Sequence, residues 1–312
     1  MIANPADFAY CGILLLDKPR GLSSSAATQR VRHLLGRIRA GHIGTLDPLA
    51  TGMLPICLGE ATKIAGVVLD GRKCYRFTIA LGARSATGDA EGDVVERRAV
   101  PALSVPDIAQ TMQRFIGGSE QVPPMYSAVK QQGQPLYKLA RAGKTVERAA
   151  RRIHIDSLDC VAWQSDTPTG PSLDCRVICR KGTYVRVLAE DLALALGTVG
   201  HVTALRREWV EPFDSAPLQA MAPMQTLAQV EALVAAGQRP SLVTPLAAMP
   251  NTPQLRLSAS QAAALQRGQR LAIDTCPLGL MLALDSQGRL LGLAHSDGAG
   301  ELSAKRLFVT PM

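Results

Sequence analysis

Asp47 is the residue best placed to do chemistry in this sequence. It lies in the glycine-rich stretch 41–63, GHIGTLDPLATGMLPICLGEATK, and Pro48 keeps its backbone out of helical geometry. Leu46 and Leu49 flank the Asp-Pro pair. A carboxylate among leucines is costly unless it is paired or functional. The pattern therefore indicates a catalytic carboxylate on a constrained loop or, alternatively, the aspartate of an Asx turn.

Two common kinds of ligand site are not indicated. A phosphate loop would end in Gly-Lys followed by Ser or Thr, and the stretch lacks this ending. His42 has no second metal ligand at a suitable spacing, and no CxxC pair is present. An odd number of cysteines at scattered positions is typical of reduced, buried thiols in a cytoplasmic protein. We therefore expect no metal site. The seven cysteines are Cys11, Cys57, Cys74, Cys160, Cys175, Cys179 and Cys276.

The charge of the chain points to an anionic partner. Its 312 residues carry a formal charge of +8, and nucleic acid is the commonest partner of a basic protein. Residues 130–152 hold seven basic side chains against Glu147 alone, together with Tyr137 and two glycines. Such a segment is typical of a mobile, phosphate-binding insertion, although an ordinary exposed loop is the alternative.

A strand and a helix precede Asp47 in the sequence. Residues 12–16 have the pattern of a short buried strand. Ser23 or Ser24 is expected to cap a helix that Gly36 ends. Because no acidic residue lies between positions 18 and 47, the polar face of this helix is a second candidate for contact with phosphates.

Irregular succession of strands and helices favours an α+β fold over a doubly wound one. We expect a large domain over residues 1–250, with an insertion at about 123–152, and a small β-rich domain over 251–312. No apolar run approaches the length of a membrane span, so a cytoplasmic protein without a membrane partner is expected. The predicted strands are 74–81, 153–158, 172–179, 184–187, 278–284, 290–294 and 306–309, and the predicted helices are 105–116, 188–196, 224–236 and 259–266.

The stretch 41–63 closely resembles the catalytic motif of bacterial tRNA pseudouridine-55 synthases, the TruB-type pseudouridine synthases. Further resemblance lies in GILLLDKPRGLSSS, RKCYRF, VPPMYSAVKQQGQPLYKLARAGKTV, CRKGTYVR and ALRR, so it covers about residues 11–213. The C-terminal part is similar to the PUA-like domain of the family, chiefly through LQRGQRL and LLGLAH. Ile43 and Ser23 stand where Thr is usual, and Arg180 precedes KGTY where Ser is common.

The resemblance implies a fold and an activity. The fold would be a mixed, mainly antiparallel sheet of the pseudouridine-synthase type, followed by a small β-rich PUA-like domain that binds RNA. The activity would be isomerisation of uridine 55 in the T arm of tRNA, with flipping of the target base. This reaction needs neither a metal nor another cofactor, because no redox change or phosphate transfer occurs. We expect the enzyme to act as a monomer.

The resemblance also implies roles for individual residues. Asp47 would be the catalytic carboxylate and Arg186 its cationic partner. Tyr75, the third catalytic residue, would lie against the target base and could also move the C5 proton. The remaining substrate contacts would come from His42, Tyr184, Leu205 and Lys18. Contacts to the RNA backbone would come from Lys130, Arg141, Lys144, Arg148, Arg151 and Arg152.

Each of these roles has a structural alternative. Without the motifs, Arg186 would be a strand arginine in a surface ion pair and Tyr75 a half-buried strand tyrosine. His42 would be a structural histidine and Leu205 a core leucine.

Two other classes of protein also remain. A non-catalytic RNA-binding protein or chaperone would be expected to lack Asp47. A metal-dependent hydrolase using His42 and Asp47 would need a second carboxylate cluster.

Overall fold

The computed structural model describes residues 10–127, 129–131, 133–168, 170–274 and 276–309. Within these residues one large sheet has nine strands in the order β13-β1-β3-β12-β4-β11-β10-β7, with β2 joined to β3. Its neighbours are antiparallel except for the pairs β1–β13 and β3–β12. The strands are β1 (Gly12–Lys18), β2 (Ala40–His42), β3 (Thr51–Leu58), β4 (Lys73–Leu81), β7 (Gly117–Gln121), β10 (Arg151–Gln164), β11 (Ser172–Cys179), β12 (Gly200–Val210) and β13 (Gln225–Thr226).

Alternating side chains give the large sheet its core face. Tyr75, Phe77 and Ile79 of β4 are buried, whereas Arg76 between them is exposed, as expected for a strand with one covered face. Helix α6 packs on β12 and β4, and α4 packs on β10. The helices of this part are α2 (Ser24–Leu34), η1 (Gly59–Ile64), α3 (Ala65–Val68), α4 (Val105–Gln113), α5 (Leu136–Arg141), α6 (Val185–Ala195), α7 (Ala216–Met221) and α8 (Leu227–Ala235).

The helix predicted after β1 is confirmed. Ser23 caps α2 by accepting a hydrogen bond from the Ala26 amide, which satisfies one of the free donors of the first turn. Ala27 and Val31 bury its apolar stripe. Gly36 follows with a φ of +80°, a conformation that an L side chain would strain.

One prediction for the middle of the chain is wrong, and one strand was not predicted. The expected strand at 184–187 is the start of α6, with Tyr184 as its N-cap. Valines at 185 and 187 suggested a strand, but Val185, Leu188 and Leu192 are buried at helical spacing, and this packing decides. Strand β12 was not predicted, because register shifts against β4 interrupt its alternation.

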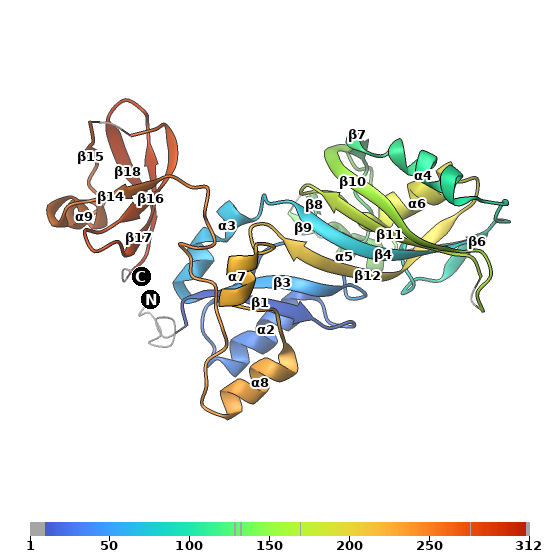
Figure 1. The fold of residues 1–312 in the computed structure, drawn as a ribbon, viewed down its shortest axis with the longest axis horizontal. Helices are drawn as coiled ribbons and strands as arrows, with labels where there is room; N and C mark the ends of the chain where they lie inside the picture. Colours follow the sequence, from blue (N-terminus) through green and yellow to red (C-terminus); the bar gives the residue numbers. More distant parts are fainter. Residues whose placement is uncertain (1–9, 128, 132, 169, 275, 310–312) are drawn as a thin grey trace.

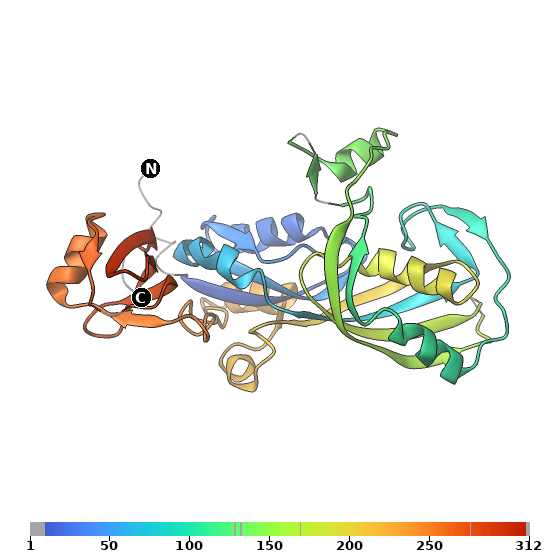
Figure 2. The ribbon, with the colours of Figure 1, turned by 90° about the horizontal axis from the view of Figure 1, so that it is seen from above.

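The described residues between 123 and 150 form a projection that contains secondary structure and is not only a polar loop. They contain the short hairpin β8 (Lys130–Gln131) and β9 (Gln134–Pro135), followed by α5. Figure 2 shows this segment standing away from the large sheet.

A second hairpin, β5 (Ala83–Ser85) and β6 (Val94–Arg97), lies beyond β4. Among the described residues, no helix is long and apolar enough to cross a membrane.

The predicted small β-rich domain is confirmed at the C-terminus. Its sheet has the order β14-β16-β17-β18-β15, and Figure 1 shows it at one end of an elongated molecule. The observed last strand begins five residues before the predicted start at 306 and ends at Leu307. The elements are β14 (Gln254–Arg256), α9 (Ala259–Gln266), β15 (Leu271–Ala272), β16 (Gly279–Leu284), β17 (Leu290–Ser296) and β18 (Glu301–Leu307).

A buried ion pair joins the small domain to the large one. The side chain of Glu60 is 4% exposed and accepts hydrogen bonds from Lys63 at 2.5 Å and from the Val309 amide at 2.8 Å. Lys63 also donates to the Leu307 carbonyl. Burial acts to raise the pKa of Glu60, but the bonds from Lys63 and Val309 and the charge of Arg39 outweigh it, so the pKa lies below its usual value.

We predict that Glu60→Gln destabilises this joint by about 2 kcal/mol, because it leaves the Lys63 ammonium without a counter-charge. Because the pKa of Glu60 is lowered in the folded state, its contribution to the free energy of unfolding is present above the ordinary pKa of 4.5. This contribution is lost as pH falls below that value. Urea unfolding at pH 7 and pH 4 measures both effects. The matched control is Glu231→Gln in the exposed Arg30 pair, with an expected cost below about 1 kcal/mol. Equal losses in the two variants would contradict the prediction.

Candidate active site

The loop that carries Asp47 is tied down on both sides of the carboxylate. Ser24 at the start of α2 donates to the Leu46 carbonyl at 3.0 Å and accepts from the Leu46 amide at 2.7 Å. The Gly21 amide donates to the Pro48 carbonyl at 2.8 Å. These bonds fix the backbone of the residues before and after Asp47, so the direction of its side chain is preorganised.

Arg186 is the direct partner of Asp47. Its Nε donates to Asp47 Oδ2 at 2.9 Å, and its side chain is only 4% exposed, whereas that of Asp47 is 34% exposed. The other two nitrogens donate to the Thr87 carbonyl at 2.7 Å and the Tyr126 carbonyl at 2.6 Å. The guanidinium is thus held from three directions, and one of these contacts is the carboxylate.

A second carboxylate, Asp89, completes this network, and sequence reasoning missed it. Its Oδ2 lies 3.6 Å from Arg186 Nη1, and its Oδ1 accepts from the Thr87 hydroxyl at 2.6 Å and from the Glu91 amide. The side chain is 5% exposed. The sequence signal for Asp89 was the polar loop TGDAEG. It is a weak signal, because an aspartate in such a loop is commonly a turn residue. Only the fold brings this loop against α6.

Opposing effects act on the pKa of Asp47. Burial raises it most strongly, and the nearby charge of Asp89 raises it further. The charge and the hydrogen bond of Arg186 lower it, as does the charge of Lys18. The net result is a pKa above the ordinary value of 3.8. Arg186 therefore limits the cost of keeping this partly buried carboxylate ionised.

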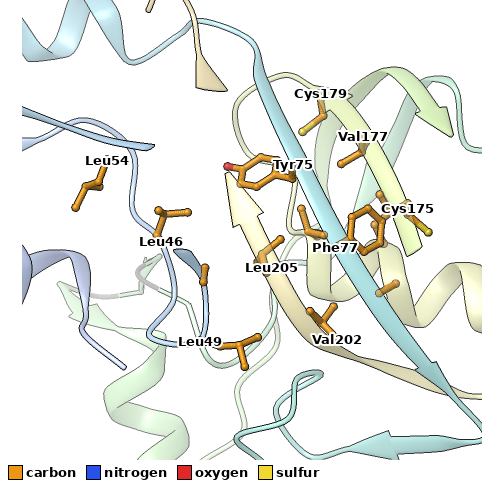
Figure 3. Packing of buried hydrophobic residues seen from close by; sticks show 14 of the residues in the cluster. Leu46, Leu49, Leu54, Tyr75, Phe77, Cys175, Val177, Cys179, Val202 and Leu205 are labelled. Atoms are coloured by element: carbon orange, nitrogen blue, oxygen red, sulfur yellow. The ribbon is translucent and has the colours of Figure 1, made fainter. Parts of the chain in front are cut away.

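Tyr75, Tyr184 and Leu205 line one pocket with Asp47 and Arg186. This pocket has a volume of about 560 Å³. Figure 3 shows Tyr75 and Leu205 on neighbouring strands, with the Tyr75 hydroxyl directed towards the loop that carries Leu46. Burial raises the pKa of Tyr75, and Arg207, which sequence reasoning also missed, opposes this. An aromatic ring and a leucine beside a carboxylate suit a flat, neutral heterocycle.

His42 lies on the other side of Asp47. It lines an adjoining pocket of about 520 Å³, which also includes Asp47 and Arg186. Its Nδ1 is 3.1 Å from the Thr28 hydroxyl of α2. Burial lowers the pKa of His42, and the charge of Arg207 lowers it further, which favours the neutral ring. The structure thus separates the predicted substrate residues into two hollows with the carboxylate between them.

Lys18, the remaining residue predicted to contact the substrate, is buried beneath the Asp47 loop. It is 0% exposed. Its ammonium donates to the carbonyls of Pro19 at 2.9 Å and Leu22 at 2.6 Å, and lies 3.4 Å from that of Pro48. Burial lowers its pKa to about 8. Lys18 therefore holds the backbone beneath Asp47 and contributes positive charge from below.

The residues predicted to bind RNA do not share one environment. Arg151 and Arg152 line the Tyr75 pocket, and Lys130 and Lys144 are exposed on the insertion. Arg148 is partly buried and donates to the Pro123 carbonyl at 3.3 Å, so it also supports the root of the insertion. The side chain of Arg141 lies outside the described part of the structure. Within that part, no group of three or more His, Cys, Asp or Glu residues could hold a metal ion.

The chain matches a known family along most of its length. Residues 32–185 match the TruB family pseudouridylate synthase N-terminal domain, residues 186–248 the tRNA pseudouridylate synthase B C-terminal domain, and residues 253–308 the C-terminal domain of pseudouridine synthase II TruB. Similar proteins named tRNA pseudouridine synthase B include those of Aromatoleum aromaticum and Cupriavidus taiwanensis. The first is 47% identical, covering 96% of this chain and 93% of its own. The second is 46% identical, with 95% and 93% covered.

Solved structures support the same fold. A Cbf5-Nop10-Gar1 complex contains a chain with a TM-score of 0.68 and 23% identity, covering 98% of this chain and 86% of its own. A chain in an H/ACA RNP bound to a substrate RNA gives a TM-score of 0.68 at 22% identity, with 96% and 85% covered. At this identity the likeness concerns the fold alone, including the small C-terminal sheet domain. With the family matches, it leads to one assignment: the chain belongs to the TruB family of pseudouridine synthases and is an isomerase.

Proposed function

We propose that this protein converts uridine 55 in the T arm of tRNA to pseudouridine, with Asp47 as the catalytic carboxylate. The observation that carries the proposal is the Asp47–Arg186 pair at 2.9 Å, at the wall of a pocket lined by Tyr75 and Leu205. The names of the relatives support tRNA as the substrate. We expect a cytoplasmic enzyme that acts as a monomer.

The reaction sets clear demands on the site. The bond between C1′ of the ribose and N1 of uracil breaks, and the freed uracil turns. C5 then bonds to C1′ and loses its proton, while N1 gains a proton. Atoms and electrons balance within the substrate, so one ionised carboxylate at the sugar–base junction suffices to begin. Asp47 could attack C1′, add to C6 of uracil or take the proton from C2′. All three routes need the same charge at the same place, which Arg186 helps to maintain.

The two hollows suggest how the target nucleotide is held. A uridine inside a stacked RNA arm cannot reach Asp47, so it must flip out at a cost of a few kcal/mol. Stacking of the base on Tyr75 would recover roughly 1–3 kcal/mol of that cost. Leu205 and Tyr184 would bound the uracil on its other sides. His42, in the adjoining hollow, is positioned to support RNA that the flip displaces.

The insertion would grip the RNA while the site works on one nucleotide. Exposed Lys130 and Lys144 stand on the projection, and Arg151 stands where it returns to the sheet. Cations of this kind bind phosphates and so position the RNA without reading its sequence. The Tyr126 carbonyl at the root of the insertion accepts from Arg186, so a physical contact joins this segment to the active-site pair.

Purified protein is expected to form pseudouridine at position 55 of an unmodified tRNA transcript, and Asp47→Asn should abolish this. Asn keeps the shape of Asp but removes its charge, so turnover should fall at least about a thousandfold while tRNA affinity stays within a few-fold. Pseudouridine mapping and filter binding measure the two quantities. Asp174→Asn, which alters the pair between Asp174 of β11 and Arg76 of β4, is the control and should keep full activity. Substantial turnover by the Asp47 variant would sink the assignment.

Arg186→Lys is expected to lower turnover about a hundredfold, although it keeps the positive charge. A lysine cannot make the three separate contacts of Arg186 to Asp47, Thr87 and Tyr126. Single-turnover kinetics at saturating tRNA is the measurement. Arg176→Lys is the matched control, because Arg176 Nε also donates to a carboxylate, that of Glu208, at 2.8 Å. Comparable activity of both variants would mean that Arg186 does not position Asp47.

Asp89→Asn is expected to move the acid limb of the pH–rate profile to lower pH. The negative charge of Asp89 raises the pKa of Asp47, so its removal should allow Asp47 to ionise at lower pH. The rate at the optimum should also fall, because Arg186 loses a neighbouring charge. Single-turnover rates between pH 4 and pH 8 test both statements. A limb that stays in place or moves upward would show that Asp89 does not act on Asp47 in this way.

A further inference from the structure

Several cationic residues line the Tyr75 pocket in addition to Arg186. Arg151 and Arg152 at the start of β10 and Arg180 in the turn between β11 and α6 all line the pocket that contains Asp47. Two chain segments thus contribute arginines to the lining of one pocket. The Arg180 amide donates to the His154 carbonyl at 2.9 Å, which fixes the turn against β10.

The other cations of this pocket already have partners. Arg186 is engaged with Asp47, and Arg207 donates to the Met53 carbonyl at 2.7 Å. Lys73 is buried and donates to two carbonyls, those of Leu69 at 3.1 Å and Gly71 at 2.6 Å. Lys181, at the mouth, pairs with Asp70 at 2.7 Å. Arg186, Arg207 and Lys73 therefore have little free capacity for an anionic ligand, whereas the pair of Lys181 is exposed on both sides and is weaker.

The three arginines at the mouth differ in this respect. Neither Arg151 nor Arg152 forms an ion pair within the described residues. Arg180 is 60% exposed, and its only ion pair there is with Asp156 at 3.8 Å. A contact of this length is weak, so Arg180 is available to a stronger anion. Arginine is suited to that task because its planar fork matches the oxygens of a phosphate.

We propose that Arg180, with Arg151 and Arg152, binds one backbone phosphate directly adjacent to the target nucleotide, and that Arg180 is a positioning residue for the RNA. The inference rests on the proposed function. A nucleoside in the pocket is neutral, but its 3′ and 5′ oxygens each carry a phosphate that must lie outside. The phosphate on the side of β10 meets the three guanidiniums, and the contact holds the nucleoside at the depth of Asp47.

The first test uses Arg180→Ala and Arg180→Lys. KM for a tRNA arm should rise about fivefold to twentyfold in Arg180→Ala, while kcat stays within about twofold, because the contact acts before the chemical step. The slope of log affinity against log salt should fall by roughly 0.7–0.9. Arg180→Lys should recover part of the affinity. Arg97→Ala is the control, since Arg97 is exposed on β6 and lines none of the pockets described above.

The second test identifies the phosphate. RNA arms are made with a neutral methylphosphonate in place of either phosphate next to the target uridine. One of these two substrates should bind the unmodified enzyme more weakly than the all-phosphate RNA does. Arg180→Ala should cause no further loss of affinity for that substrate. The proposal would be overturned if the affinity losses from Arg180→Ala and from the methylphosphonate were additive at both linkages. It would also be overturned if Arg180→Ala left KM and the salt slope unchanged.

These outcomes are separable from failure of the proposed function. If the enzyme modifies position 55 and Asp47→Asn is inactive, normal RNA affinity in Arg180→Ala refutes the phosphate site alone. If the enzyme modifies no tRNA, the proposed function fails first. Thermal unfolding midpoints of the Arg180 variants should match the unmodified protein, because the side chain is largely exposed. A large drop in the midpoint together with a lower kcat would assign Arg180 a structural role instead.

Discussion

A carboxylate that must stay ionised beside a neutral, flat substrate needs a cation that water does not screen, and the rest of this site depends on that constraint. Arg186 supplies the charge from a side chain with almost no exposed surface. Burying a guanidinium is itself costly, and the cost is offset only because every nitrogen has a partner. The site is therefore a network of mutually dependent contacts rather than one reactive residue.

The network ties together segments that are distant in the sequence. Arg186 comes from the first turn of α6, its carbonyl partners from the loop after β5 and from the root of the insertion, and Asp47 from the loop before β3. Ser24 of α2 holds that loop by two hydrogen bonds. The large sheet brings these segments together, because β3, β12 and β4 are neighbours in it. Movement of any one segment would change the distance between the carboxylate and the guanidinium.

Positive charge is divided between two roles. Buried cations such as Arg207 and Lys18 bond to backbone carbonyls and hold the pocket walls. Among the described residues, the exposed cations Lys130 and Lys144 form no ion pair and Arg180 forms only a long one at 3.8 Å, which suits a polyanion that must bind and then leave. The joint at Glu60 has a third arrangement, in which a buried carboxylate neutralises Lys63 and holds the chain just after β18. Burial and pairing, not residue type, separate these roles.

Local signals in the sequence determined much of this protein. Alternation predicted β4, Ser23 and Gly36 bounded α2, and the motif around Asp47 identified the family, because propensity, capping and motif are properties of neighbouring residues. The sequence alone could not show that Asp89 approaches Arg186, that Lys18 is buried, or that the segment 184–187 begins a helix. Each of these depends on packing between segments far apart in the chain. Pairing across a sheet is set by long-range burial and register, which no local pattern specifies.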